Sequence, residues 1–155
     1  MRMLHRLTVI TLTAGLFAPV LASAQNAQAA GTCCNTDPHG VAIASKGIGE
    51  SAPLALDVSQ VSAWKAFEFK RDGVWYLQVN DRDGNVRAII GNIDREFWTL
   101  PGGVDADRVS LPRHLLDIPA GAQRTVVYRK PQMLLVGYNT AGGMMWSVES
   151  PDGTR

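Results

Sequence analysis

The chain has 155 residues, 46% of them hydrophobic and 19% charged, with 15 basic and 14 acidic residues. This length provides one domain and its core but not two, and the composition is too apolar for a wholly disordered chain. The near-neutral charge provides no concentrated positive face for a phosphate backbone, so we expect no nucleic acid partner. One apolar run is long, which excludes a membrane protein with several spans.

That run belongs to residues 1–24, which have the layout of a secretory signal peptide. Arg2 and Arg6 form a basic start, an apolar stretch follows, and small residues lead to Ala24, the expected cleavage point. A second site of small residues ends at Ala29 and is an alternative. Cleavage at Ala24 leaves 13 of the 15 basic residues and all 14 acidic ones, a formal charge of about −1. The sequence therefore predicts a periplasmic or secreted protein with no stable membrane span after cleavage.

Residues 25–53 are rich in Ala, Gly, Ser and Asn and lack a period of 2 or 3.6 residues. We predict a flexible leader over this range, in which residues 41–44 are a candidate edge strand. Residues 54–62 fit either a strand or a single helical turn. The folded β domain is predicted to span residues 54–155.

Beyond Ala63, short runs of aromatic and β-branched residues are separated by turns, a pattern typical of an antiparallel meander. Asp72-Gly73 and Asp83-Gly84 predict hairpins, because glycine accepts the positive φ that tight turns need. The fold class that follows is mainly β, with about seven antiparallel strands in a sandwich or a partly open barrel. The expected strands are 64–70, 74–80, 86–90, 96–100, 125–129, 133–139 and 144–149.

Residues 104–123 form a long connection that contains Pro112 and Pro119. A connection of this length predicts a short helix over residues 114–117 or an excursion across one end of the sheet. The chain also carries one tryptophan in each of four different predicted strands. Because each ring buries a large apolar area, we expect these tryptophans to form the core, with an exposed binding platform as the alternative. They are Trp64, Trp75, Trp98 and Trp146.

Strand alternation predicts a second, non-core face that carries Tyr76, Gln78, Arg87 and Tyr138. Aromatic and arginine side chains are enriched in binding hot spots, so these four are the predicted binding residues. No catalytic constellation or cofactor motif accompanies them. We therefore expect a non-enzymatic binding protein without a cofactor, whose partner is an envelope protein, another envelope component or a small ligand.

Two soft thiolates and an imidazole, Cys33, Cys34 and His39, lie within seven residues of the leader. Thiolates suit Cu(I) and Zn(II), so these residues are the candidate metal ligands of an alternative function in metal or thiol handling. Adjacent cysteines joined to one another would cross-link nothing distant, so oxidised, intermolecular and metal-bound states all stay open.

Residues 81–85, Asp-Arg-Asp-Gly-Asn, resemble the start of a calcium loop, but the glycine comes at the fourth position instead of the sixth. A hairpin turn explains these residues better. A hydrolase is a further alternative, with His114 as the candidate base and Asp117 three residues later. The sequence supplies no nucleophile elbow to accompany His114.

Overall fold

A computed structural model describes residues 43–152 and 154–155. The predicted signal peptide, the cleavage sites and most of the predicted leader lie outside the described residues. So do Cys33, Cys34 and His39, the candidate metal ligands.

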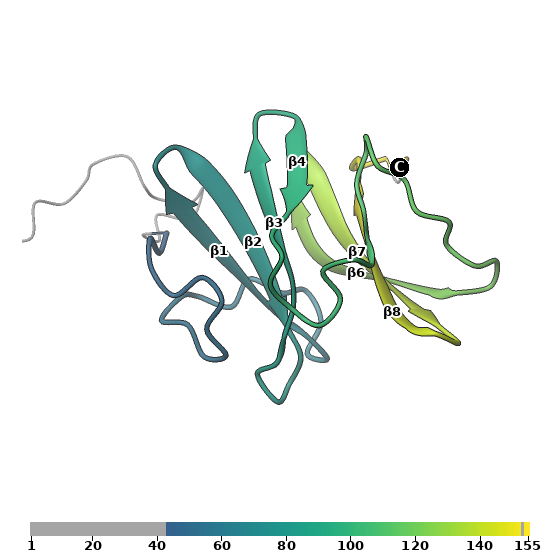
Figure 1. Ribbon diagram of the computed structural model, residues 1–155, viewed down its shortest axis with the longest axis horizontal. Coiled ribbons are helices and arrows are strands. Elements are labelled where there is room, and N and C mark those ends of the chain that lie inside the picture. Colours follow the sequence, from purple (N-terminus) through teal and green to yellow (C-terminus); the bar gives the residue numbers. More distant parts are fainter. Residues whose placement is uncertain (1–42, 153) are drawn as a thin grey trace, which may run out of the picture. The chain divides into compact units, whose positions relative to one another are not determined.

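Four strands form the first sheet: β1 (Lys65–Arg71), β2 (Val74–Asn80), β3 (Val86–Ile93) and β4 (Glu96–Thr99). They lie in sequence order and every neighbouring pair is antiparallel, which confirms the predicted meander (Figure 1). The strands form because hydrophobic side chains alternate along them and turn residues separate them.

The second sheet has the order β5-β8-β7-β6. β6 (Gln123–Lys130), β7 (Met133–Thr140) and β8 (Gly143–Glu149) are antiparallel, and β5 (Val109–Ser110) lies parallel to β8. The described residues thus form eight strands, one more than expected, in two sheets that are not closed into a barrel. β5 was missed because two residues carry no alternation signal.

Asp-Gly turns close the hairpins as predicted. Asp72 and Gly73 have φ of 52° and 83°, so both central residues of the β1–β2 turn are left-handed, as a type I′ turn requires. In the next turn, Asp81 accepts hydrogen bonds from the backbone N–H groups of Asp83 and Asn85, at 3.1 and 2.9 Å. These bonds occupy the Asp81 carboxylate and are those of a hairpin turn.

The inner faces of the two sheets share one hydrophobic core, and Trp146 at its centre is fully buried. Trp64 packs edge-on against Trp146 with ring centroids 4.9 Å apart. The expectation that all four tryptophans form the core is only half met. Trp75 is half-buried at one end of the space between the sheets, and Trp98 is half-buried on the outer face of the first sheet, across Gly91.

A buried carboxylate, that of Asp105, joins the two sheets through hydrogen bonds with β3 and β8. Asp105 is 4% exposed and accepts hydrogen bonds from Nε and Nη2 of Arg87, on β3, at 2.8 and 3.0 Å. The same carboxylate accepts a 2.9 Å bond from Nε1 of Trp146, on β8. One short connecting segment therefore fixes a strand of each sheet.

Residues that precede Leu54 belong to the packed structure. Ala44 accepts a 2.9 Å hydrogen bond from the backbone N–H of Lys70, and Gly49 donates a 2.7 Å bond to Oε1 of Gln78. Asn80, which is fully buried, donates to the carbonyl of Ser51 at 3.1 Å. The folded part was expected from Leu54, whereas these contacts begin at Ala44, because two buried amides on β2 need backbone partners.

The connection between β4 and β6 contains no helix in the described residues. Instead of the helix considered for residues 114–117, Leu111 and His114 exchange a pair of backbone hydrogen bonds. Leu116 then donates a 3.1 Å bond to the Ser110 hydroxyl on β5. Of the two expectations for this connection, the helix is wrong, since its prolines disfavour a helix and the segment instead forms β5 and the bridge between Leu111 and His114.

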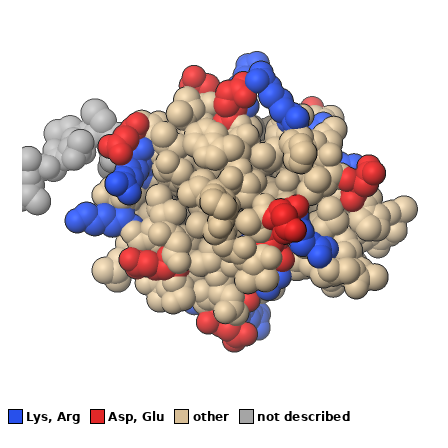
Figure 2. Space-filling view, viewed as in Figure 1, with Lys and Arg blue, Asp and Glu red and all other residues tan. Residues whose placement is uncertain are grey.

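Charged side chains of both signs are interspersed on the face shown in Figure 2, mostly around its margin, with uncharged side chains across its centre. No helix among residues 43–152 and 154–155 is long and apolar enough to cross a membrane.

Candidate functional site

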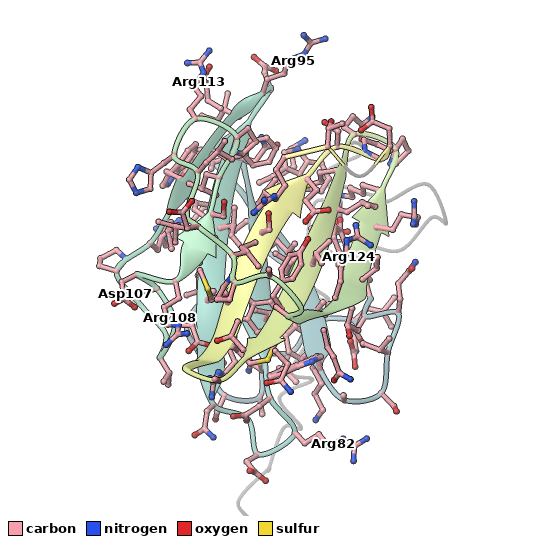
Figure 3. The ribbon with its side chains drawn as sticks, turned by 90° about the vertical axis from the view of Figure 1, so that its right-hand side faces the viewer. Arg82, Arg95, Asp107, Arg108, Arg113 and Arg124 are labelled. Atoms are coloured by element: carbon pink, nitrogen blue, oxygen red, sulfur yellow. The ribbon has the colours of Figure 1, made fainter. Side chains whose placement is uncertain are left out.

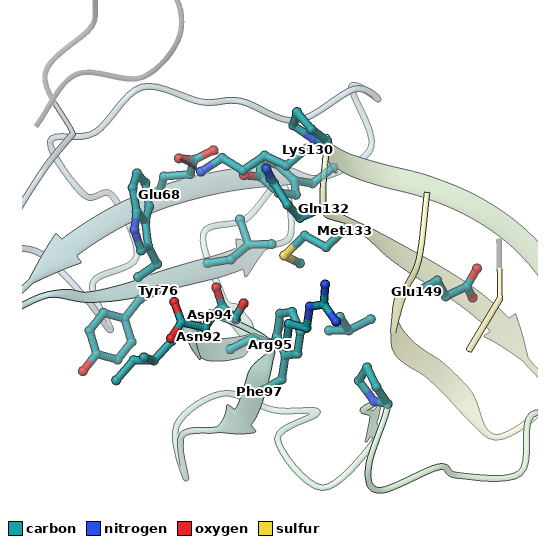
Figure 4. A pocket seen from close by; sticks show the side chains of 18 of the residues that line it. Glu68, Tyr76, Asn92, Asp94, Arg95, Phe97, Lys130, Gln132, Met133 and Glu149 are labelled. Carbon is teal, nitrogen blue, oxygen red and sulfur yellow. Dashed lines mark hydrogen bonds and ion pairs between the residues drawn. The ribbon is translucent and has the colours of Figure 1, made fainter. Parts of the chain in front are cut away.

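A cavity of about 1200 Å³ lies between the two sheets at one end of the sandwich (Figure 4). Three turns surround it: the β1–β2 turn with Gly73, the β3–β4 turn with Asp94 and Arg95, and the β6–β7 turn with Pro131 and Gln132. The known ligand pockets of proteins have volumes of roughly 300–1,000 Å³, so this cavity is large enough for a small molecule.

Strand register explains why the cavity walls are apolar. Trp75 and Leu77 are two residues apart on β2 and therefore project from the same face, and Leu77 pairs with Ile90 on β3. Trp75 on β2 and Phe97 on β4 are both paired with Asn92 on β3, so their side chains project from the same face of the sheet. The second sheet contributes the remaining apolar lining, namely Tyr128, Met133 and Val148.

One side of the cavity holds a partly buried ionic cluster that connects the two sheets. Glu68, on β1, accepts a hydrogen bond from the Tyr128 hydroxyl and a 2.6 Å bond from Nζ of Lys130, both on β6. The side chains of Glu68 and Lys130 are 11% and 24% exposed. Both carboxylate oxygens of Glu68 are therefore engaged by donors from the opposite sheet.

The ring of Trp75 lies beside this cluster and interacts with two ammonium groups. Nζ of Lys130 lies 3.9 Å from the centroid of the Trp75 ring, and Nζ of Lys70 lies 5.3 Å from it. Both distances are within the range of cation–π attraction, which is strongest for tryptophan. The ring and the two cations thus form one electrostatic unit at the β1–β2 end of the cavity.

Arg95 lies at the mouth of the cavity, and in Figure 4 its side chain lies beside Phe97. Figure 3 shows Arg95 and Arg113 at the same end of the described structure. Arg113 forms a 2.7 Å ion pair with Glu96, whereas Arg95 has no ion pair with any described residue. Arg95 is therefore a free cation at the entrance.

The structure does not gather the four predicted binding residues into one patch. Tyr76 lies at the edge of the cavity. Gln78 is fully buried against the segment that precedes Leu54, and Arg87 is held by Asp105. Tyr138 lies on the second sheet, on the face that points away from the core.

Tyr138 belongs to a cluster with the exposed Arg124 and with Glu149, which is buried and also lines the cavity. The Tyr138 hydroxyl donates to Oε1 of Glu149, and Nη2 of Arg124 donates to Oε2, both at 2.7 Å. Burial, together with the hydrogen bond to Glu149, raises the pKa of Tyr138. The hydrogen bond to Glu149 also raises the pKa of Arg124. These contacts satisfy Glu149, which is 2% exposed.

His114, the candidate base of the hydrolase alternative, is exposed and pairs with Leu111 through its backbone. Ser110, the nearest hydroxyl in the sequence, is fully buried and accepts a backbone hydrogen bond from Leu116. The described residues contain no group of three or more His, Cys, Asp or Glu side chains that could hold a metal ion.

Sequence reasoning missed the charged residues of the cavity, which are Glu68, Asp94, Arg95, Lys130 and Glu149. A signal for Glu68 was present, because it shares a strand face with Ala66, which is fully buried. A charged residue at an inward position is costly unless it is paired, so it indicates a partner across the core. That the partner is Lys130 follows only from the packing of β1 against β6. No family model, curated protein or solved structure matches this chain.

Proposed function

We propose that this chain is an exported, non-enzymatic binding protein whose β domain takes a small apolar or amphipathic ligand between its two sheets. The observation that carries the proposal is the cavity of about 1200 Å³, with aromatic and aliphatic walls and one ionic cluster. Mostly apolar walls with a few fixed polar groups are the usual composition of a ligand site.

The state of the charged groups favours binding over catalysis. Two carboxylates in the cavity wall have both oxygens engaged: Glu68 accepts hydrogen bonds from Tyr128 and Lys130, and Glu149 accepts them from Tyr138 and Arg124. A general base needs a free oxygen within reach of the proton that it removes. A carboxylate engaged in this way instead holds the walls in place for a ligand.

The signal-like sequence of residues 1–24 supports the exported part of the proposal. Because the cavity fits a small molecule, we expect the partner to be a small molecule of the periplasm or of the medium outside the cell. The N-terminal sequence of the exported protein tests this part: a start at Gln25 or Ala30 supports export with cleavage, and a start at Met1 contradicts it.

Titration of the purified full chain with phenylnaphthylamine, a neutral apolar fluorophore, tests the cavity. Phe97→Asp places a charge in the apolar wall and is expected to weaken binding by about tenfold or more. The matched control is Leu115→Asp, because Leu115 is 59% exposed and does not line the cavity. Circular dichroism of both variants checks folding. If the two substitutions change the affinity equally, or if neither does, the fluorophore binds elsewhere and the proposal is wrong.

A further inference from the structure

We infer that the ligand of this cavity is an anionic amphiphile, whose acidic head group binds at the mouth while its apolar part lies between the sheets. This inference rests on the proposed function and adds the chemical class of the ligand. Its evidence is the distribution of paired and unpaired charges around the cavity.

Two of the three carboxylates that line the cavity are already bound, whereas two cations at this end of the described structure have no ion pair with a described residue. Lys130 and Lys70 flank the Trp75 ring, and Arg95 stands at the mouth. The acidic lining residues are Glu68, Glu149 and Asp94. Glu68 and Glu149 already accept hydrogen bonds from this chain, and Asp94 lies at the tip of the β3–β4 turn. Lys70 and Arg95, the cations without an ion pair to a described residue, therefore outnumber Asp94, and their unpaired charge lowers the free energy of a bound anion.

The cations also retain N–H donors for a ligand, whereas both oxygens of Glu68 already accept hydrogen bonds. Lys130 has three N–H donors and gives one to Glu68, and the guanidinium of Arg95 has five donors and no carboxylate partner among the described residues. Glu68 already accepts from Tyr128 and Lys130. Arg95 is thus the side chain best placed to form new charge-assisted hydrogen bonds with a carboxylate or phosphate.

A cationic ligand would lack its usual aromatic partner here. Ammonium ligands bind over the face of a tryptophan, but the chain's own Lys130 already lies 3.9 Å from the centroid of Trp75. A second cation at this ring would be repelled by Lys130 and by Lys70, which lies 5.3 Å from the same centroid. Asp94 would be left to bind a cation alone, at an exposed turn where a single ion pair contributes little.

The apolar walls fix where the rest of the ligand lies. Leu77 and Ile90, of the first sheet, and Met133, of the second, are buried and line the cavity. An anion that binds Arg95 at the mouth would place an attached hydrocarbon chain among these side chains. Burial of each methylene then adds affinity, by about fourfold per group when burial is complete.

Displacement of cavity-bound phenylnaphthylamine tests the inference with three ligands of equal chain length: decanoate, decanol and decyltrimethylammonium, each below its micelle concentration. Decanoate is expected to displace the fluorophore at the lowest concentration and the ammonium compound at the highest. Decanol or the ammonium compound binding as tightly as decanoate would overturn the inference. The inference would also be overturned if the Phe97→Asp variant shows that the fluorophore binds in the cavity and none of the three ligands displaces it. In each of these cases, the proposed binding function would still stand.

Arg95→Gln provides the residue-level test. This variant is expected to bind decanoate about two- to fivefold more weakly, as for an exposed charge pair, and decanol unchanged. The control is Arg82→Gln, which removes the same charge at the opposite end of the described structure (Figure 3). Equal losses in both variants would show a general effect of surface charge and refute the role of Arg95. If the fluorophore does not bind in the cavity at all, the proposed function itself fails.

Discussion

Replacing Asp105 by alanine should destabilise the protein more than any surface substitution, because three donors converge on this one carboxylate. The side chain is 5% exposed and accepts two hydrogen bonds from Arg87 and one from the buried indole of Trp146. Removing one partner of a buried ion pair costs about 3–5 kcal/mol. The Arg87 side chain is 21% exposed and keeps a 3.7 Å ion pair with Asp81, so this part of the loss is expected near the lower limit.

The indole of Trp146 adds a second penalty. Its ring is fully buried, so the N–H has no access to water once Asp105 is removed. An unsatisfied buried donor costs about 1–3 kcal/mol. Together the two losses give about 4 kcal/mol, a large part of the 5–15 kcal/mol by which whole domains are stable.

Urea titration followed by tryptophan fluorescence measures this loss. With a slope of about 1–3 kcal/mol per molar urea, the midpoint of Asp105→Ala should fall by more than about 1 M. Asp107→Ala is the matched control, since Asp107 is exposed and two residues further along the same segment. A midpoint for Asp105→Ala equal to that of Asp107→Ala would refute the view that this carboxylate joins the sheets.

Three other expectations concern packing, chain length and pH. Trp146→Ala removes a fully buried ring and should cost about 3–5 kcal/mol, whereas Trp75→Ala, at the half-buried cavity wall, should cost less; reversed urea midpoints would contradict these placements. A chain of residues 54–155 lacks the backbone partners of the buried Gln78 amide, so it should unfold at lower urea than the full chain, and equal midpoints would exclude a structural role for those partners. Burial raises the pKa of Tyr138, so the folded state keeps this proton to higher pH than the unfolded state. The resulting stabilisation is present below about pH 10 and is lost as the pH rises through the folded pKa; Tyr138→Phe should flatten this alkaline decline, and an unchanged decline would assign it to other groups.

Local sequence signals predicted the strands and hairpins closely, because these features depend on neighbouring residues. The β2 strand, residues 74–80, matches the prediction residue for residue, and Asp72-Gly73 forms the expected tight turn. Alternation also placed Tyr76 and Gln78 correctly on the face opposite Leu77. Period and turn chemistry are properties of a few consecutive residues, so they are readable without the fold.

Which side chains are free to bind a ligand could not be read in this way. Gln78 lies on the predicted second face, yet that face is covered by residues that precede Leu54, and Arg87 is bound to Asp105. Alternation divides a strand into two faces but does not say what covers each face. The coverage comes from segments that are distant in the sequence.

The sequence by itself determined the β class, the order of the main strands and their turns, since hydrophobic periodicity and positive-φ glycines are local. Tertiary structure alone decided the cavity and its charges. Glu68 and Lys130 are 62 residues apart and meet only when β1 packs against β6, and Trp75 acquires its two cations at the same place. Such contacts arise from the packing of two sheets, because burial of a charge is stable only beside a partner that the other sheet provides.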